Sequence, residues 1–130
     1  MMAFHKALME FWQQFGLPVY VEGCVDDGAA FPYITIRIAE GTLMGSGFLL
    51  ATSWHRKAPE DSMSVAMAER GAFLDAVRAA IPVQGKVLPF DGGYAILDRP
   101  PADFLTYSVD GEDDSIIGGR VSYEVRFYNL

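Results

Sequence analysis

The amino-acid sequence reads Phe31-Pro32-Tyr33-Ile34-Thr35-Ile36-Arg37-Ile38 at the stretch that decides its fold. The isoleucines occupy alternate positions, and Tyr33, Thr35 and Arg37 stand between them. Because successive side chains of a strand point to opposite faces, this period of two predicts a strand with one face on a hydrophobic core and the other face available. The same alternation returns near the end of the chain, where apolar positions from Val121 to Phe127 alternate with polar ones.

A helix is predicted on each side of this strand along the chain. Residues 2–15 place large apolar side chains at spacings of three and four, and Gly16 ends the pattern. The second helix starts at Ser62 or Ser64 and runs to Ile81. The first helix lacks the row of basic residues that would bind an anionic membrane. We therefore expect both helices to pack on a sheet or a partner.

Further strands are predicted by short apolar runs between turn residues. The strands cover residues 19–21, 33–39, 47–56, 86–90, 94–97, 104–109 and 120–128. Asp91-Gly92-Gly93 is a hairpin turn, because glycine adopts a positive φ without strain, and Gly118-Gly119 is assigned to a turn before the last strand. The resulting order, α-β-β-β-α-β-β-β-β, predicts an α+β fold whose mostly antiparallel sheet carries two helices packed on one face.

Length and composition limit the possible functions. The 130 residues suffice for one domain, residues 1–130, with a substantial core. The net charge of −7 disfavours nucleic-acid binding, although it suits a protein that sits near DNA without adhering to it. The single cysteine, Cys24, excludes an internal disulfide and suits a reducing compartment. We recognise no secretory signal and no membrane-spanning run, so we expect a cytoplasmic protein.

No group of residues forms a recognised catalytic motif. Cys24 could pair with His5 or His55 as thiolate and imidazole, but no motif joins them, and a lone cysteine is more often a small packing residue. The acidic cluster at 110–114 lacks the spacing of a calcium loop, and the glycine pairs lack the ending of a phosphate-binding loop. We therefore expect no catalytic, cofactor-binding or metal-binding residues, and no enzyme.

The strand at 47–56 is the best candidate for an assembly surface. It carries large side chains on both faces, and oligomers often cover exposed strands with a second subunit. Tryptophan and arginine are enriched where subunits meet. We predict an oligomer interface made of Trp54, His55, Arg56, Phe48 and Leu50. The alternative is that Trp54 is an ordinary core residue.

Several segments follow one another in an order that is known from one family. They are Gly16-Leu17-Pro18-Val19-Tyr20, Ala30-Phe31-Pro32-Tyr33-Ile34-Thr35, a strand ending in Trp54, an alanine-rich helix ending at Ile81-Pro82, Leu88-Pro89-Phe90-Asp91-Gly92-Gly93, and an alternating strand from Val121 to Tyr128. In these segments the chain resembles the small tail-terminator, tail-completion or minor-capsid (head–tail joining) proteins of tailed phages and prophages. The resemblance spans nearly the whole chain and consists of structural motifs.

The resemblance implies a homo-oligomeric ring, commonly a hexamer, at the head-proximal end of a tail tube. Such a ring stops tube growth and meets the head connector without catalysis or a cofactor. Its partners are copies of itself, tail-tube proteins and head-connector proteins, and its location is the cytoplasm during assembly and then the virion. The acidic residues Asp110, Glu112, Asp113 and Asp114 face either the lumen or bulk solvent. The alternative function is that of a small-ligand-binding or regulatory domain with a pocket between the first helix and the sheet.

Overall fold

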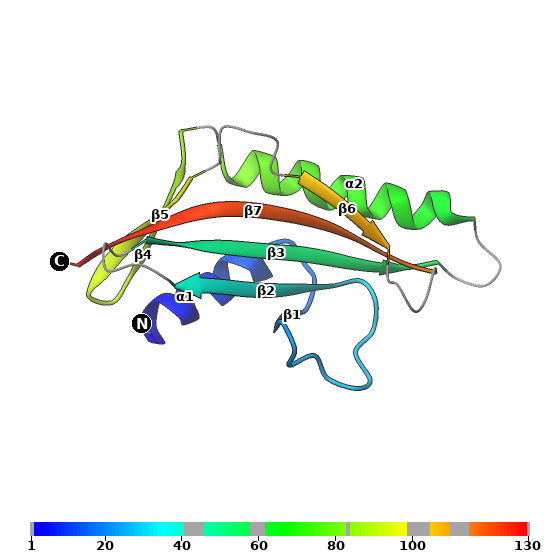
Figure 1. Cartoon of the computed structure of the whole chain (residues 1–130), viewed down its shortest axis with the longest axis horizontal. Coiled ribbons are helices and arrows are strands. Elements are labelled where there is room, and N and C mark those ends of the chain that lie inside the picture. Colours follow the sequence, from blue (N-terminus) through cyan, green and yellow to red (C-terminus); the bar gives the residue numbers. More distant parts are fainter. Residues whose placement is uncertain are drawn as a thin grey trace.

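The computed structural model of the chain describes residues 2–40, 46–57, 62–82, 84–98, 105–109 and 115–129. Its elements follow the predicted order (Figure 1). They are α1 (Met2–Gln13), β1 (Val19–Val21), β2 (Tyr33–Glu40), β3 (Ser46–Arg56), α2 (Met63–Ala80), β4 (Lys86–Phe90), β5 (Gly93–Asp98), β6 (Leu105–Val109) and β7 (Ile116–Asn129). The bounds of the helices and of most strands lie within two residues of the predicted ones.

One sheet contains all of these strands, in the order β1-β2-β3-β7-β5-β4, with β6 also paired to β7. Only β1 and β2 run parallel, and the other pairs are antiparallel. The long strand β7 lies along β3 on one side, and on the other side it pairs with β6 and then with β5. The prediction of an α+β fold with a mostly antiparallel sheet is confirmed.

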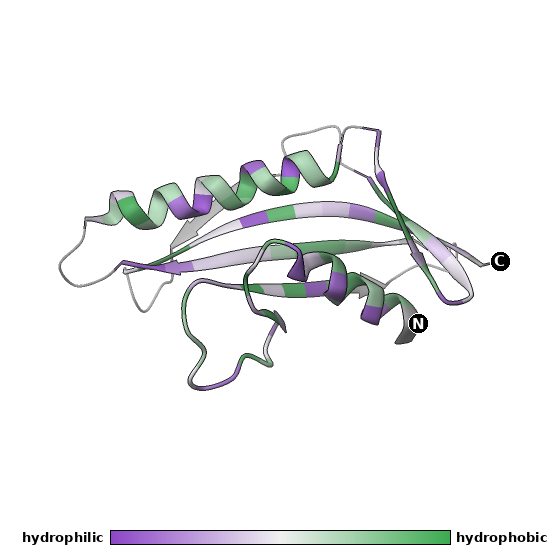
Figure 2. Ribbon diagram, turned by 180° about the vertical axis from the view of Figure 1, so that it is seen from behind, coloured by the Kyte–Doolittle hydropathy of each residue, from purple (hydrophilic) through white to green (hydrophobic). Residues whose placement is uncertain are grey.

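Both helices pack on the same face of this sheet, which we call the inner face. Their buried side chains join those of the strands in one hydrophobic cluster, and Trp12 of α1 lies beside Phe73 of α2 with ring centroids 6.4 Å apart. Figure 2, seen from behind relative to Figure 1, shows α1 in front of β2 and β3. The register places Ile36, Ala51 and Val121 side by side across β2, β3 and β7, and all three are buried.

The last strand is longer than predicted. The turn assigned to Gly118-Gly119 is wrong, because β7 starts at Ile116 and both glycines are paired with β3. A Cβ on Gly119 would lie 2.8 Å from Cγ of Arg70 on α2, well inside van der Waals contact. Glycine therefore continues the strand here and lets α2 approach the sheet closely.

Candidate functional site

The opposite face of the sheet, which we call the outer face, carries most of the predicted interface. Phe48, Leu50, Trp54 and Arg56 occupy alternate positions of β3 and so point to this face. Phe48 is 59% exposed, although it is a large apolar residue in mid-sheet. Both described helices lie on the inner face, so neither of them covers these side chains.

His55 does not belong with the other four residues. It stands between Trp54 and Arg56 along β3 and therefore points to the opposite, inner face, where it is 1% exposed. A side chain that is sealed under α2 has no surface to offer a second subunit. The predicted interface therefore divides between two faces, and His55 is placed in a different site.

Polar contacts hold the middle of the outer face in order. Trp54 donates from Nε1 to Oγ1 of Thr35 at 3.0 Å, and Arg120 donates from Nε to Oγ1 of Thr52, also at 3.0 Å. Arg120 also reaches Glu22 at the sheet edge, with 3.6 Å between the charged atoms. These contacts satisfy the two threonines, which are buried on a face that neither described helix covers. Trp54 and Arg120 therefore each reach across to a neighbouring strand.

Aromatic rings gather at one end of the outer face. Tyr33 lies 5.7 Å from the ring of Tyr20 and 4.9 Å from the ring of Phe31. The guanidinium of Arg56 sits 4.5 Å above the Phe31 ring, a cation–π distance. Together with Trp54 these residues form a fixed surface of rings and a cation, which is the composition found at the centre of protein–protein contacts.

The other end of the outer face is also ordered. The rings of Tyr94 and Tyr128 stack with centroids 5.0 Å apart. Arg126 donates a hydrogen bond from Nη2 to Oδ2 of Asp98, and this bond raises the pKa of the guanidinium above its ordinary value. The outer face thus presents arginines along its length, in a chain whose net charge is −7.

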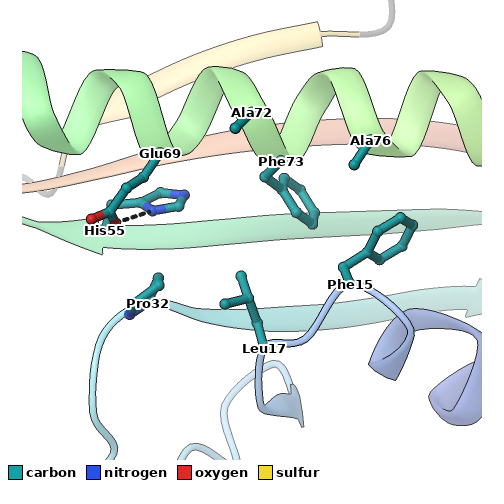
Figure 3. A pocket seen from close by; sticks show the side chains of 8 residues that line it. All are labelled: Phe15, Leu17, Pro32, His55, Glu69, Ala72, Phe73 and Ala76. Atoms are coloured by element: carbon teal, nitrogen blue, oxygen red, sulfur yellow. Dashed lines mark hydrogen bonds and ion pairs between the residues drawn. The ribbon is translucent and has the colours of Figure 1, made fainter.

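On the inner side, a groove of about 290 Å³ lies between α2 and the segment that follows α1. Figure 3 shows apolar side chains from both sides facing each other across it. The groove is lined by Phe15, Leu17, Pro32, His55, Glu69, Ala72, Phe73 and Ala76. When the imidazole of His55 is neutral, Glu69 is the one charged residue in this lining. The groove is therefore apolar, with a single carboxylate at its side.

His55 links the sheet to that carboxylate. Its Nε2 lies 2.8 Å from Oγ of Ser53, and its Nδ1 lies 3.2 Å from Oε2 of Glu69 (Figure 3). Burial lowers the pKa of His55 from 6.5, and this outweighs the opposing hydrogen bond and charge of Glu69; the nearby positive charge of Arg70 lowers it further. The imidazole is therefore neutral at pH 7 and donates one ring N–H.

The order Ser53–His55–Glu69 is that of a hydrolytic triad, but its nucleophile is sealed. Ser53 is 0% exposed and sits in mid-strand, opposite Ile34 on one side and Gly119 on the other. A substrate carbonyl has no path to its Oγ. Cys24 is exposed, and both ring nitrogens of His55 are engaged by Ser53 and Glu69, so the thiolate–imidazole pair considered above does not form with His55. The network fixes α2 to β3.

Sequence reasoning missed Ser53 and Glu69. Ser53 and His55 stand two positions apart on one strand, which a pattern of period two places on one face. Glu69 comes from α2, and no spacing along the chain signals that it meets His55.

A second pocket, of about 230 Å³, lies where a ligand pocket was expected, between α1 and the sheet. Its walls come from α1, from the edge strand β1 and from its neighbour β2. They are His5, Leu8, Met9, Val21, Ile36 and Ile38. The lining is almost wholly apolar.

The predicted acidic loop, Asp110, Glu112, Asp113 and Asp114, lies outside the described residues. Within the described residues, no three His, Cys, Asp or Glu side chains gather as metal ligands would. No helix in the described ranges is long and apolar enough to span a membrane.

No protein-family model matches the chain, and no curated protein matches it. Four chains of solved structures match. One of them is 16% identical in sequence, with a TM-score of 0.57 over 99% of this chain and 93% of its own. At this identity the likeness shows that the two chains share a fold and nothing further.

Proposed function

We propose that this protein is a structural subunit that assembles with copies of itself through the outer face. The observation that supports this most strongly is a whole sheet face that both described helices leave bare while it carries Phe48, Trp54 and several arginines. Domains are usually built so that each apolar layer is covered by another. A face of fixed aromatic and arginine side chains is therefore best explained by a partner that covers it.

Within this class, we propose a tail-terminator or head–tail joining protein of a tailed phage or prophage, acting as a ring without catalysis. The resemblance of segments along the whole chain supports this choice. The charge of −7 supports it too, because DNA would pass an acidic ring without adhering. Its partners would be tail-tube and head-connector proteins, first in the cytoplasm and later in the virion.

The test is the mass of the purified protein in solution, measured by light scattering over a range of concentrations and at two salt concentrations. The proposal predicts a mass that rises with concentration toward a closed multimer, and rings in electron micrographs of the largest species. A mass equal to one chain at every concentration would contradict self-assembly.

The second candidate function is small-ligand binding, and the pocket beside α1 favours it. Hydrophobic pockets with few polar groups are the usual form of small-molecule sites. Mass spectrometry of the native protein would detect a bound apolar compound, and Leu8→Trp, which fills the pocket, should remove it. A protein purified without such a compound, and with the multimer present, would favour the structural function alone.

A further inference from the structure

The groove beside α2 has a chemical character that selects its occupant. Phe15, Leu17 and Phe73 give it apolar walls, and Glu69, with its side chain 46% exposed, adds one negative charge. One carboxylate oxygen of Glu69 is bound to His55, and this bond holds the side chain at one end of the groove (Figure 3). A long aliphatic stem with a cationic head fits such walls, because the stem lies along the apolar surface and the head meets the carboxylate.

The outer face of the same chain carries a side chain of that kind. The side chain of Arg37 is 63% exposed, against 37% for Arg120 and 47% for Arg126. Its contact with Glu22 is loose, with 3.9 Å between the charged atoms. Arg126 and Arg120 are held by hydrogen bonds, to Asp98 and Thr52 respectively. Of these three arginines, Arg37 therefore loses the weakest contact within its own subunit when its side chain turns toward a partner.

We infer that the groove receives Arg37 from the outer face of a second copy of this chain, with Glu69 as its partner. This inference rests on the self-assembly proposed above and adds a specific contact that orients one subunit on the next. The groove lies on the helical side of the sheet and Arg37 on the bare side, so the two halves of the contact are on opposite sides of each subunit. Such a contact is head-to-tail, and repetition of it gives a closed ring when the rotation closes.

Two conservative variants test the contact without disturbing the fold. Glu69→Gln keeps an oxygen that accepts from His55 and removes the charge, and Arg37→Gln removes the cation. Each should raise the dissociation constant of the multimer at least about tenfold, as expected for truncation of a desolvated charge pair. Asp75→Asn and Lys86→Gln make the same charge changes at exposed positions that do not line the groove, and each should change the dissociation constant less than about threefold.

Charge reversal gives the sharper experiment. Glu69→Arg and Arg37→Glu should each leave a monomer, because like charges then face each other across the contact. An equimolar mixture of the two variants should assemble again with alternating chains, since the carboxylate introduced in one variant then meets the guanidinium introduced in the other. Light scattering measures all three samples. Circular dichroism and melting of each variant establish that the monomers are folded.

The results separate this inference from the proposed function. A wild-type multimer that both glutamine variants leave intact would overturn the Arg37–Glu69 contact while self-assembly stands. Folded single variants that stay monomeric even when mixed would also overturn the pairing. A wild-type protein that is monomeric at every concentration would overturn both.

Discussion

The two faces of the sheet are made by neighbouring residues of the same strands, yet they differ in almost every property. On β3, Leu49 is fully buried under the helices, whereas Phe48 beside it is 59% exposed. His55 is sealed on the inner face, whereas Trp54 lies on the outer one and donates a hydrogen bond to Thr35. The comparison teaches that the inner face makes the fold and that the outer face contributes little to it, which leaves the outer face free for assembly.

The largest expected effect comes from breaking the inner face. Leu49→Ala should lower the free energy of unfolding by about 2–5 kcal/mol, because it leaves a cavity in the closed core. Leu50→Ala, the matched change on the outer face, should cost less than about 1.5 kcal/mol, because a half-buried side chain leaves no closed cavity. Urea unfolding followed by circular dichroism measures both. Equal losses would show that the outer face contributes to the fold as much as the inner one.

The close approach of α2 to the inner face gives the next effect. Gly119→Ala should lower the free energy of unfolding by about 1–3 kcal/mol, because the added Cβ overlaps the stem of Arg70. Gly71→Ala in α2 should raise it by about 0.5–1 kcal/mol, because the added Cβ would meet nothing within 4 Å beyond the neighbouring backbone of its own helix. The same unfolding curves check both changes. If Gly119→Ala left the free energy of unfolding unchanged, α2 would not be in close contact with the sheet at this position.

The buried imidazole makes stability depend on pH. Because the pKa of His55 is lowered in the folded protein, the unfolded chain binds more protons as the pH falls below about 6.5. The folded state should therefore lose stability from about pH 6.5 down to the lowered pKa, by at most about 1.4 kcal/mol per pH unit. Melting temperatures between about pH 5.5 and 7.5 measure the slope around the ordinary pKa of histidine. His55→Gln should remove it, and an identical slope in that variant would contradict the burial of a neutral His55.

Much of the fold was predictable because its signals are local. Alternation at 33–38 and the apolar stripe of α1 follow from side-chain geometry within one element. The continuation of β7 through Gly118-Gly119 was not predictable, because glycine pairs usually mark turns and the reason for them is a helix from elsewhere in the chain. The parallel pairing of β1 with β2 was not predictable either, because the three residues of β1 carry no pattern that indicates strand direction.

The candidate site was predictable in part. The alternation of side chains along β3 already places Phe48 and Trp54 on one face and His55 on the other. The sequence was therefore enough to show that His55 lies on the opposite face from the rest of the predicted interface. The groove could not, because Glu69 and Phe15 belong to separate elements that meet only in the folded chain. Whether the outer face binds another subunit remains a prediction.

Trp54 tests the outer face at a smaller cost to the fold. Trp54→Ala should lower the free energy of unfolding by about 1 kcal/mol, as expected for loss of one hydrogen bond at a partly buried site. It should reduce assembly far more, because truncation of a central tryptophan typically costs about 2 kcal/mol or more in binding. Melting and light scattering on the same sample compare the two effects. Unchanged assembly with a lowered melting temperature would assign Trp54 to the fold.

The most direct test of the account uses the least disruptive change. Phe48→Lys places a charge on the exposed ring position of the outer face, opposite Glu124 of β7. It should alter the free energy of unfolding by less than about 0.5 kcal/mol, as surface substitutions usually do. The solution mass of this variant should be that of one folded chain at concentrations where the wild-type protein is a multimer. A multimer as stable as the wild type would contradict the claim that the outer face joins the subunits.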